Sequence, residues 1–295
     1  PLSLGCLGVT SDGTAYRYLV EHADLVIFLG AGFNERTSYL WDERLLAGKK
    51  VAQVDRDAAQ LGKVYRPDVA IQGDIREVLG QLLATLSSHG TDADGLAEAR
   101  VARLKAHRKA VRGLPDEGEG RAEAEVGEDP RFHLMRHFFA GLAARFPRDT
   151  LIFDDNIVFA QSYFHVSHAN HYFPNTGISS LGHAIPAAIG ARFFARSGPI
   201  FAILGDGGFQ MCCMELMTAV NYGTPLNVVV INNASMGLIR KNQYQLYGER
   251  YLDCDFVNPD FRLLAQSFGI RHHHLASEAD IDALFAEADL ENAIN

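Results

Sequence analysis

Two short polar motifs each follow an apolar run in the second half of the chain, and their spacing constrains the fold. Gly205-Asp206-Gly207 comes directly after the run 199–204, and Asn232-Asn233 comes directly after 226–231. The 24 residues between the motifs leave room for one strand-helix-strand crossover. Parallel strands joined in this way end at the same edge of a sheet, where ligands collect in open α/β folds. We therefore expect Asp206 and Asn233 to meet in one crevice.

The residue types in these motifs suit a cation and a phosphate group. Asp206 and Asn233 both offer oxygen, and Mg2+ prefers oxygens from one or two carboxylates and from ligand phosphates. Gly207 and Gly208 allow an anion to approach the backbone closely, and we expect a helix to begin near Phe209 with its free amides toward phosphate. A lone Gly-Asp-Gly also fits an ordinary strand-to-helix turn. The pair of motifs at crossover spacing is what predicts a Mg2+-diphosphate site.

The paired motifs resemble the thiamin diphosphate signature of enzymes that decarboxylate or ligate 2-oxo acids. The resemblance extends through 177–190, 236–238 and 258–261, and it is strongest to acetolactate synthase and its relatives, with benzoylformate-decarboxylase-like enzymes second. It implies that Asp206, Asn233 and the main-chain carbonyl of Ser235 bind the metal. It further implies cofactor-binding positions at Ser179, Leu181, Gly205, Asp206, Gly207, Gly208, Asn233, Gly237 and Leu238.

Three of the matched residues carry expectations about the reaction. Leu181 matches the apolar wedge that holds the cofactor in a V shape, with an ordinary core leucine as the alternative. The carbonyl of Ser179 matches the acceptor for the pyrimidine amine. Arg36 matches an arginine that binds the carboxylate of the second 2-oxo acid, as a planar guanidinium does well, with a surface arginine as the alternative.

These matches favour carboligation, in which pyruvate is decarboxylated and its two-carbon unit is transferred to a second 2-oxo acid. A 2-oxo acid decarboxylase of the benzoylformate decarboxylase type and a non-catalytic cofactor-binding module are the alternatives. The resemblance also implies a homodimer or homotetramer and an N-terminal pyrimidine-binding domain that supplies an activating glutamate. The chain begins with Pro1 and offers no match to that glutamate. We therefore expect a fragment that is inactive when isolated.

Apolar periodicity predicts an α/β protein with two parallel-sheet units, the second of them doubly wound. We assign residues 1–90 to part of a Rossmann-like middle domain, 91–129 to a linker and 130–295 to the thiamin diphosphate and Mg2+ domain. The expected strands are 24–30, 50–55, 69–72, 150–154, 199–204, 226–231 and 270–275. The expected helices are 74–86, 97–112, 130–146, 180–196, 209–222, 260–268 and 278–288.

The first unit also resembles the part of acetolactate synthase that binds FAD. The resemblance rests on Gly30-Ala31-Gly32, Asp55-Arg56-Asp57 and Gly73-Asp74, which each come at the end of an expected strand. Glycine-rich turns after strands also occur in α/β domains that bind no nucleotide. FAD is therefore a candidate cofactor beside thiamin diphosphate and Mg2+.

Composition narrows the class of partner. A net charge of −9 and a pI near 5.7 argue against general attraction to nucleic acid or to acidic membrane surfaces. Neither a span of membrane length nor an export leader is evident, so a cytoplasmic location and small 2-oxo acids as substrates are expected. Cys212 and Cys213 are expected as core residues. His272, His273 and His274 are expected along a strand, where alternation separates the middle ring from its neighbours.

Overall fold

The computed structural model describes residues 13–34, 38–88, 94–112, 132–157, 160–164, 169–175, 179–194 and 197–295, together with Leu4, Leu7 and Gly8. Contacts divide the chain into two compact units, residues 1–128 and 129–295. Each unit contains a sheet in which the paired strands run parallel. The predicted parallel α/β fold is therefore confirmed.

The first unit contains a three-stranded sheet in the order β1-β2-β3. Its strands are β1 (Leu25–Leu29), β2 (Lys50–Asp55) and β3 (Val69–Gln72), as the sequence predicts. The helices are α1 (Thr14–His22), α2 (Ile75–Ser88) and α3 (Asp94–Arg112), with short 3-10 turns at Glu43–Leu45 and Ala58–Gln60. Asp74 accepts a hydrogen bond from the Arg76 amide at 3.0 Å, and this bond satisfies an amide in the first turn of α2.

The second unit contains a four-stranded sheet in the order β5-β4-β6-β7. The strands are β4 (Leu151–Asp154), β5 (His171–Pro174), β6 (Ile200–Gly205) and β7 (Asn227–Ile231). In the register of β6 and β7, Gly205 pairs with Ile231. The two strands that precede the polar motifs are therefore neighbours and end together, as the crossover spacing predicts.

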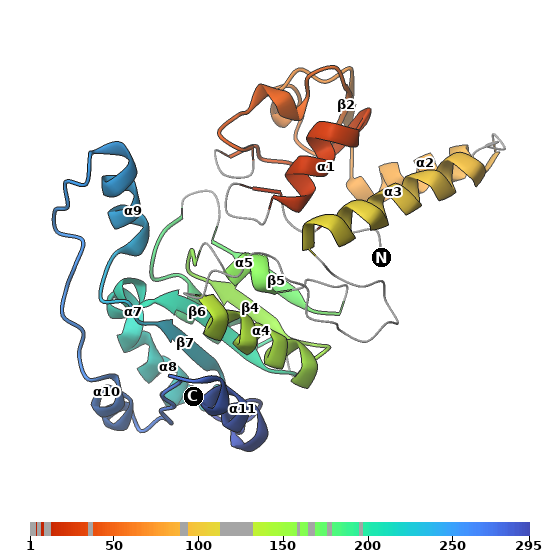
Figure 1. The fold of residues 1–295 in the computed structure, drawn as a ribbon. Coiled ribbons are helices and arrows are strands. Elements are labelled where there is room, and N and C mark those ends of the chain that lie inside the picture. Colours follow the sequence, from red (N-terminus) through yellow and green to blue (C-terminus); the bar gives the residue numbers. More distant parts are fainter. Residues whose placement is uncertain are drawn as a thin grey trace. The chain divides into compact units, whose positions relative to one another are not determined.

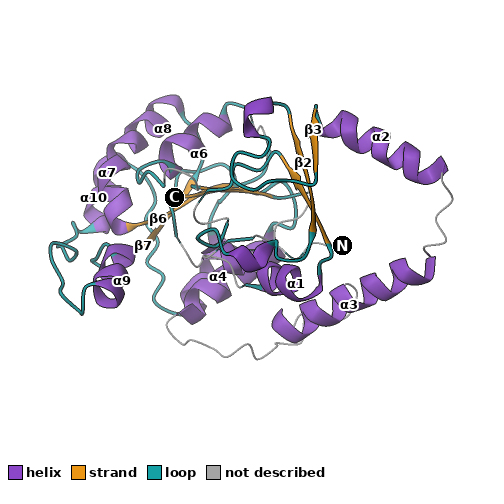
Figure 2. Cartoon of the chain, turned by 90° about the horizontal axis from the view of Figure 1, so that it is seen from above, coloured by secondary structure: helices purple, strands orange, loops and turns teal. Residues whose placement is uncertain are grey.

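Helices cover both faces of this second sheet (Figures 1 and 2). On one face lie α6 (Ala184–Arg192), α8 (Leu216–Tyr222) and α10 (Phe261–Phe268), and on the other lie α4 (His133–Arg145) and α11 (Glu278–Glu287). Strand β6 is apolar from Ile200 to Leu204 because alternate side chains serve opposite cores. The core under α6, α8 and α10 receives Ile200, Ala202 and Leu204, and the core under α4 and α11 receives Phe201 and Ile203.

The helix after β6 begins earlier than the sequence prediction placed it. Helix α7 (Asp206–Cys212) starts directly after the strand, and a 3-10 turn at Cys213–Glu215 separates it from α8. Gly205 keeps an extended conformation, and the Asp206 carboxylate accepts a hydrogen bond from the Gly207 amide. An acidic residue in the first turn stabilises a helix start, so the predicted start near Phe209 is wrong.

Residues 270–275 form no strand, contrary to the prediction. Ile294 and Asn295 occupy the edge of β7, where the Asn295 amide donates to the Leu226 carbonyl and the Val228 amide donates to the Asn295 carbonyl. The Arg271 amide bonds to Ile294 instead of to β7. The histidines at 272–274 therefore do not lie on a strand.

Four of the described helices and strands were not expected from the sequence: strand β5 and the helices α1, α5 (Ala160–Tyr163) and α9 (Gly237–Leu246). Helix α9 follows the second polar motif. Among the described residues, no helix combines the length and the apolar character that a membrane crossing requires.

Candidate functional site

The carboxylate of Asp206 joins the end of β6 to the loop that follows β7. Asp206 is only 1% exposed. Oδ2 accepts hydrogen bonds from the backbone amides of Asn233 at 3.1 Å and Ala234 at 2.5 Å, while Oδ1 accepts one from the Gly207 amide at 3.0 Å. The structure therefore brings the two polar motifs into direct contact at one edge of the sheet.

Asn258 completes this network from a distant part of the chain. Its side-chain amide donates to Asp206 Oδ2 at 2.7 Å and to Asn232 Oδ1 at 2.9 Å. Its own Oδ1 accepts from the Gln210 side chain at 2.6 Å. Because four donors converge on the buried Asp206 carboxylate, the desolvation of its negative charge is compensated and its orientation is set.

The turn after β7 presents two oxygen ligands close together in sequence. Asn233 is exposed, and its Oδ1 accepts a hydrogen bond from the Ser235 amide at 3.2 Å. The Ser235 carbonyl accepts from the Gly237 amide at 2.9 Å, and its hydroxyl donates to the Cys254 carbonyl at 3.0 Å. Between them Ala234 has a φ of 51°, a left-handed conformation that costs a non-glycine residue about 1–3 kcal/mol. Such strain is characteristic of functional turns.

Gly207 and Gly208 sit where a side chain would collide with the rest of the site. A Cβ at Gly207 would strike the Met236 sulfur and come within 3.4 Å of Phe256. A Cβ at Gly208 would lie 2.5 Å from Oδ2 of Asp155. The first turn of α7 is therefore packed closely against both the second motif and the end of β4, and glycine is required at both positions.

Asp155 holds the loop that precedes α6. It follows β4 directly and is 1% exposed. Oδ2 accepts from the Gly182 amide at 2.7 Å and Oδ1 accepts from the His183 amide at 3.0 Å, with the Asn175 side chain 3.3 Å away. Since Gly208 packs on the same carboxylate, Asp155 connects this loop to the glycines of the first motif.

The predicted wedge residue Leu181 lies in this loop and is partly buried. Ser179, two residues earlier, has a φ of 56°, again a left-handed conformation in a non-glycine residue. Gly182 has a φ of 85°, and a Cβ added at Gly182 would lie 3.6 Å from the Cβ of Cys212 in α7. The loop that carries Ser179 and Leu181 is therefore packed on the helix that begins with Asp206.

The remaining predicted positions are distributed as follows. Gly205 lies at the end of β6 and caps α7 with an extended backbone. Gly237 and Leu238 open α9, and a Cβ at Gly237 would be 3.0 Å from Nδ2 of Asn233. The start of α9, with Gly237 and Leu238, is therefore packed close to Asn233 of the second motif. Arg36 lies outside the described residues.

Two residues of this network were not assigned a role from the sequence. Asp155 follows an apolar strand as Asp206 does, and that position is the signal that could have identified it. Asn258 is separated from Asp206 by 51 intervening residues of loop and helix, so no spacing rule connects them. Its contact with the carboxylate becomes visible only in the folded chain.

The glycine turns proposed for FAD also gather at one sheet edge, in the first unit. The Gly30 amide donates to the Val54 carbonyl and the Gly73 amide to the Asp55 carbonyl, both at 2.9 Å. The side chain of Asp74 is engaged by Arg56 at 2.5 Å. This edge has glycines at the strand ends, as nucleotide sites do, but the carboxylate of Asp74 is already paired with Arg56.

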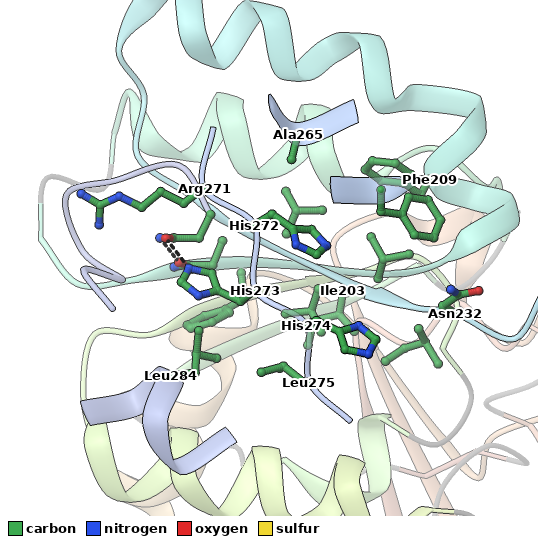
Figure 3. A pocket seen from close by; sticks show the side chains of 18 of the residues that line it. Ile203, Phe209, Asn232, Ala265, Arg271, His272, His273, His274, Leu275 and Leu284 are labelled. Carbon is green, nitrogen blue, oxygen red and sulfur yellow. Dashed lines mark hydrogen bonds between the residues drawn. The ribbon is translucent and has the colours of Figure 1, made fainter. Parts of the chain in front are cut away.

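A large cavity of the second unit is lined by other residues than Asp206. It has a volume of about 530 Å³ and runs along β7, between α4 and α10 and beside the segment 270–275 (Figure 3). Its walls are mainly apolar and include Ile203, Leu275 and Leu284. The cavity therefore lies between β7 and residues 270–275, the segment that was expected to form a strand.

Family models match both units of the chain. The C-terminal TPP binding domain of thiamine pyrophosphate enzymes matches residues 155–293, and the central domain of thiamine pyrophosphate enzymes matches residues 1–82. The first match contains Asp155, the loop of Leu181, both polar motifs and Asn258.

Relatives in other organisms are named acetolactate synthase large subunit. The protein of Pyropia yezoensis is 32% identical over 91% of this chain and 44% of its own length. That of Lactococcus lactis subsp. lactis (strain IL1403) is 31% identical over 92% of this chain and 45% of its own. The isozyme 2 large subunit of Escherichia coli (strain K12) is 27% identical over 96% of this chain and 48% of its own.

The chain spans a little under half of the length of these relatives. Within that span, the C-terminal family match covers the motifs at the ends of β6 and β7. The chain therefore belongs to the thiamine pyrophosphate enzymes, of which it carries the central domain and the C-terminal TPP-binding domain.

Proposed function

We propose that the chain is the cofactor-binding part of an acetolactate synthase-like carboligase that depends on thiamin diphosphate and Mg2+. Its substrates would be 2-oxo acids: pyruvate loses carbon dioxide and its two-carbon unit is transferred to a second 2-oxo acid. The observation that carries this proposal is the buried Asp206 carboxylate, which the amides of Asn233 and Ala234 hold at the junction of β6 and β7.

The donor set at this junction fits Mg2+. A carboxylate has about four lone-pair positions, and three donors converge on Oδ2 of Asp206 whereas one reaches Oδ1. Oδ1 therefore retains acceptor capacity toward a cation. Asn233 Oδ1 and the Ser235 carbonyl add two neutral oxygens from the adjacent turn. An all-oxygen set with a single carboxylate, completed by diphosphate oxygens, matches the preference of Mg2+.

The diphosphate would lie against Gly207 and Gly208. These positions have no side chain between the backbone and an anion, and they adjoin Asp206 in sequence. Met236 and Asp155 limit the space around them, so substitution would displace the turn rather than fill a void. The bound metal would neutralise part of the charge that the diphosphate brings to this carboxylate-rich edge.

Thiamin diphosphate, when bound, supplies a nucleophilic carbon that adds to ketones and accepts the electrons released by decarboxylation. The protein has to bind and orient it. Leu181 would support the cofactor between its two rings, and the Ser179 carbonyl would accept a hydrogen from the pyrimidine amine. Ser179 has a left-handed backbone conformation, and Asp155 accepts hydrogen bonds from the Gly182 and His183 amides. Together these features fix the conformation of the loop. Gly237 and Leu238 would pack on the other ring face.

Carboligation is favoured over simple decarboxylation by two considerations. The relatives that cover most of the chain are named acetolactate synthases, and Arg36 matches a carboxylate-binding arginine for the second 2-oxo acid. We further propose that an N-terminal pyrimidine-binding domain supplies the activating glutamate and that the enzyme works as a homo-oligomer. FAD in the first unit stays a prediction, supported by the two glycine turns at Gly30 and Gly73, which lie at one edge of the sheet.

The test is a complementation assay with pyruvate, thiamin diphosphate and Mg2+. The chain is assayed alone and with an added pyrimidine-binding domain from an acetolactate synthase, and the products are separated into acetolactate and acetaldehyde. Acetolactate that forms only in the mixture supports the proposal. Acetaldehyde as the main product would instead identify a decarboxylase, and cofactor binding without either product in the mixture would identify a non-catalytic module.

A further inference from the structure

Two histidines and a glutamate meet in the first unit, between helices that the cofactor chemistry does not use. Glu21 and His22 end α1, and His107 lies in α3. One ligand atom from each of the three lies within 4.8 Å of the other two. His22 Nε2 is 3.7 Å from a carboxylate oxygen of Glu21, and the two imidazole rings stand perpendicular with centroids 5.5 Å apart.

The ring of His107 is held in one tautomer. Its Nε2 lies 3.1 Å from the carbonyl oxygen of Thr14, a fully buried residue. Because a carbonyl only accepts, Nε2 must carry the hydrogen and donate it. The lone pair is therefore on Nδ1. A histidine whose second nitrogen donates to a backbone carbonyl is the usual arrangement around a protein-bound metal ion, since that bond orients the ring and raises its basicity.

Tyr18 encloses the pair of rings. Its ring makes edge contacts with both His22 and His107, at 5.3 Å between centroids in each case. The side chain of His22 is 31% exposed and that of Glu21 is 56% exposed. One side of the cluster is therefore shielded by an aromatic wall, while the other is open to an entering ion and to a water ligand.

The chemistry of the donors selects the ion. Two imidazole nitrogens and one carboxylate oxygen suit Zn2+, which takes three protein ligands and a water in open sites. Ca2+ and Mg2+ prefer oxygen throughout. Tetrahedral ligands at about 2.0–2.1 Å from zinc lie roughly 3.4 Å apart. The observed separations therefore need to close by about 1.4 Å at most, which rotation of the exposed Glu21 side chain and small ring movements can supply.

We propose that Glu21, His22 and His107 form a Zn2+ site that ties α3 to α1. Such a site would fix α3 to α1 within the first unit, because its ligands come from both of these helices. It is independent of thiamin diphosphate and of the Asp206 network. The alternative is an aromatic and imidazole cluster that holds the same helices without any ion.

The test is a Co2+ titration of the full chain after EDTA treatment, followed by displacement with Zn2+. Four-coordinate Co2+ absorbs visibly, and we expect one ion per chain in the wild type. His22→Gln and His107→Gln should each weaken binding at least tenfold, and E21Q should weaken it as well. A His272→Gln/His274→Gln variant removes exposed histidines elsewhere and should bind as the wild type does.

Hydrogen exchange gives a second readout. Zn2+ should slow the exchange of α3 amides in the wild type and in the His272→Gln/His274→Gln control, but not in His22→Gln. If His107→Gln loses helix docking, E21Q and His22→Gln still test the site, since Glu21 and His22 are partly exposed and their variants keep the Thr14 contact. The proposal is overturned if the wild type shows no four-coordinate Co2+ spectrum, or if E21Q and His22→Gln bind as tightly as the wild type.

Discussion

Gly208→Ala should destabilise the wild-type chain but stabilise a chain that already carries Asp155→Ala. In the wild type, the added methyl group would lie 2.5 Å from Asp155 Oδ2, and both Asp155 and Gly208 are buried. Overpacking of this kind costs about 1–3 kcal/mol. Without the carboxylate, the methyl group instead enters the space that Asp155 leaves, and alanine gains up to about 1 kcal/mol over glycine in a helix.

The single change Asp155→Ala has its own cost. It removes the acceptor of two backbone amides, those of Gly182 and His183, at 2.7 and 3.0 Å. Bonds to a charged acceptor contribute roughly 1.5–3 kcal/mol each, so a loss of roughly 3 kcal/mol is expected. The coupling energy between the two substitutions should then be on the order of 2 kcal/mol, with a change of sign in the effect of Gly208→Ala.

The assay is urea unfolding followed by circular dichroism for the wild type, the two single variants and the double variant. Hydrogen exchange in α6 and α7 assigns the change to the second unit, because the two units of the chain can unfold separately. If Gly208→Ala costs the same free energy in both backgrounds, the contact between Asp155 and Gly208 does not link the Leu181 loop to the first motif, and the reasoning is refuted.

Three further predictions concern single positions. Gly207→Ala should weaken Mg2+-dependent thiamin diphosphate binding about tenfold by calorimetry, because its methyl group would strike Met236. Gly190→Ala, whose methyl group would meet no neighbouring atom within 4 Å, should bind normally. Equal binding by both variants would contradict the placement of the diphosphate against Gly207. Burial raises the pKa of the Cys212 thiol to about 12, so it should stay protonated and resist iodoacetamide at pH 8–9 in mass spectra of the folded chain, and rapid alkylation would contradict its burial. Ser277→Ala should lower the stability of the second unit by about 1 kcal/mol through loss of the capping box. The Ser277 hydroxyl and nearby backbone amides lower the pKa of Asp280. The stability that the ionised Asp280 side chain contributes should therefore be full above about pH 4 and be lost on further acidification. A difference in unfolding free energy between wild type and Ser277→Ala that stays constant down to about pH 2 in urea would contradict this prediction.

The parts of the fold that local sequence determines were predictable. Strand β6 is apolar on both faces because it lies in the middle of the sheet, and the polar motifs mark where β6 and β7 end. The spacing between the motifs was enough to place Asp206 and Asn233 together. Asp260 and Ser277 cap their helices through side-chain bonds to N3 amides, a pattern that depends only on neighbouring residues.

The errors arose where tertiary contacts decide between local alternatives. Residues 270–275 were predicted as a strand, yet they form none, and Ile294 and Asn295 occupy the edge of β7. Helix α7 starts at Asp206 because the carboxylate accepts bonds from its own helix and from the turn after β7, and only the first of these partners is local. Asn258 reaches Asp206 across a long loop, which no periodicity reveals.

We propose that Asp206 and Asn233 would hold a divalent ion together with the diphosphate of the cofactor. Calorimetric titration of the full chain with thiamin diphosphate, in Mg2+ and then in EDTA, tests it most directly when Asn233→Ala is compared with Asn232→Ala. Both asparagines are exposed and adjacent, but only Asn233 is assigned to the metal; Asn232 accepts a hydrogen bond from Asn258, whose own bond to Asp206 does not depend on it. We expect binding to require Mg2+ and to fall at least tenfold in Asn233→Ala, with Asn232→Ala close to the wild type. Binding that persists in EDTA, or that is equally strong in both variants, would contradict it.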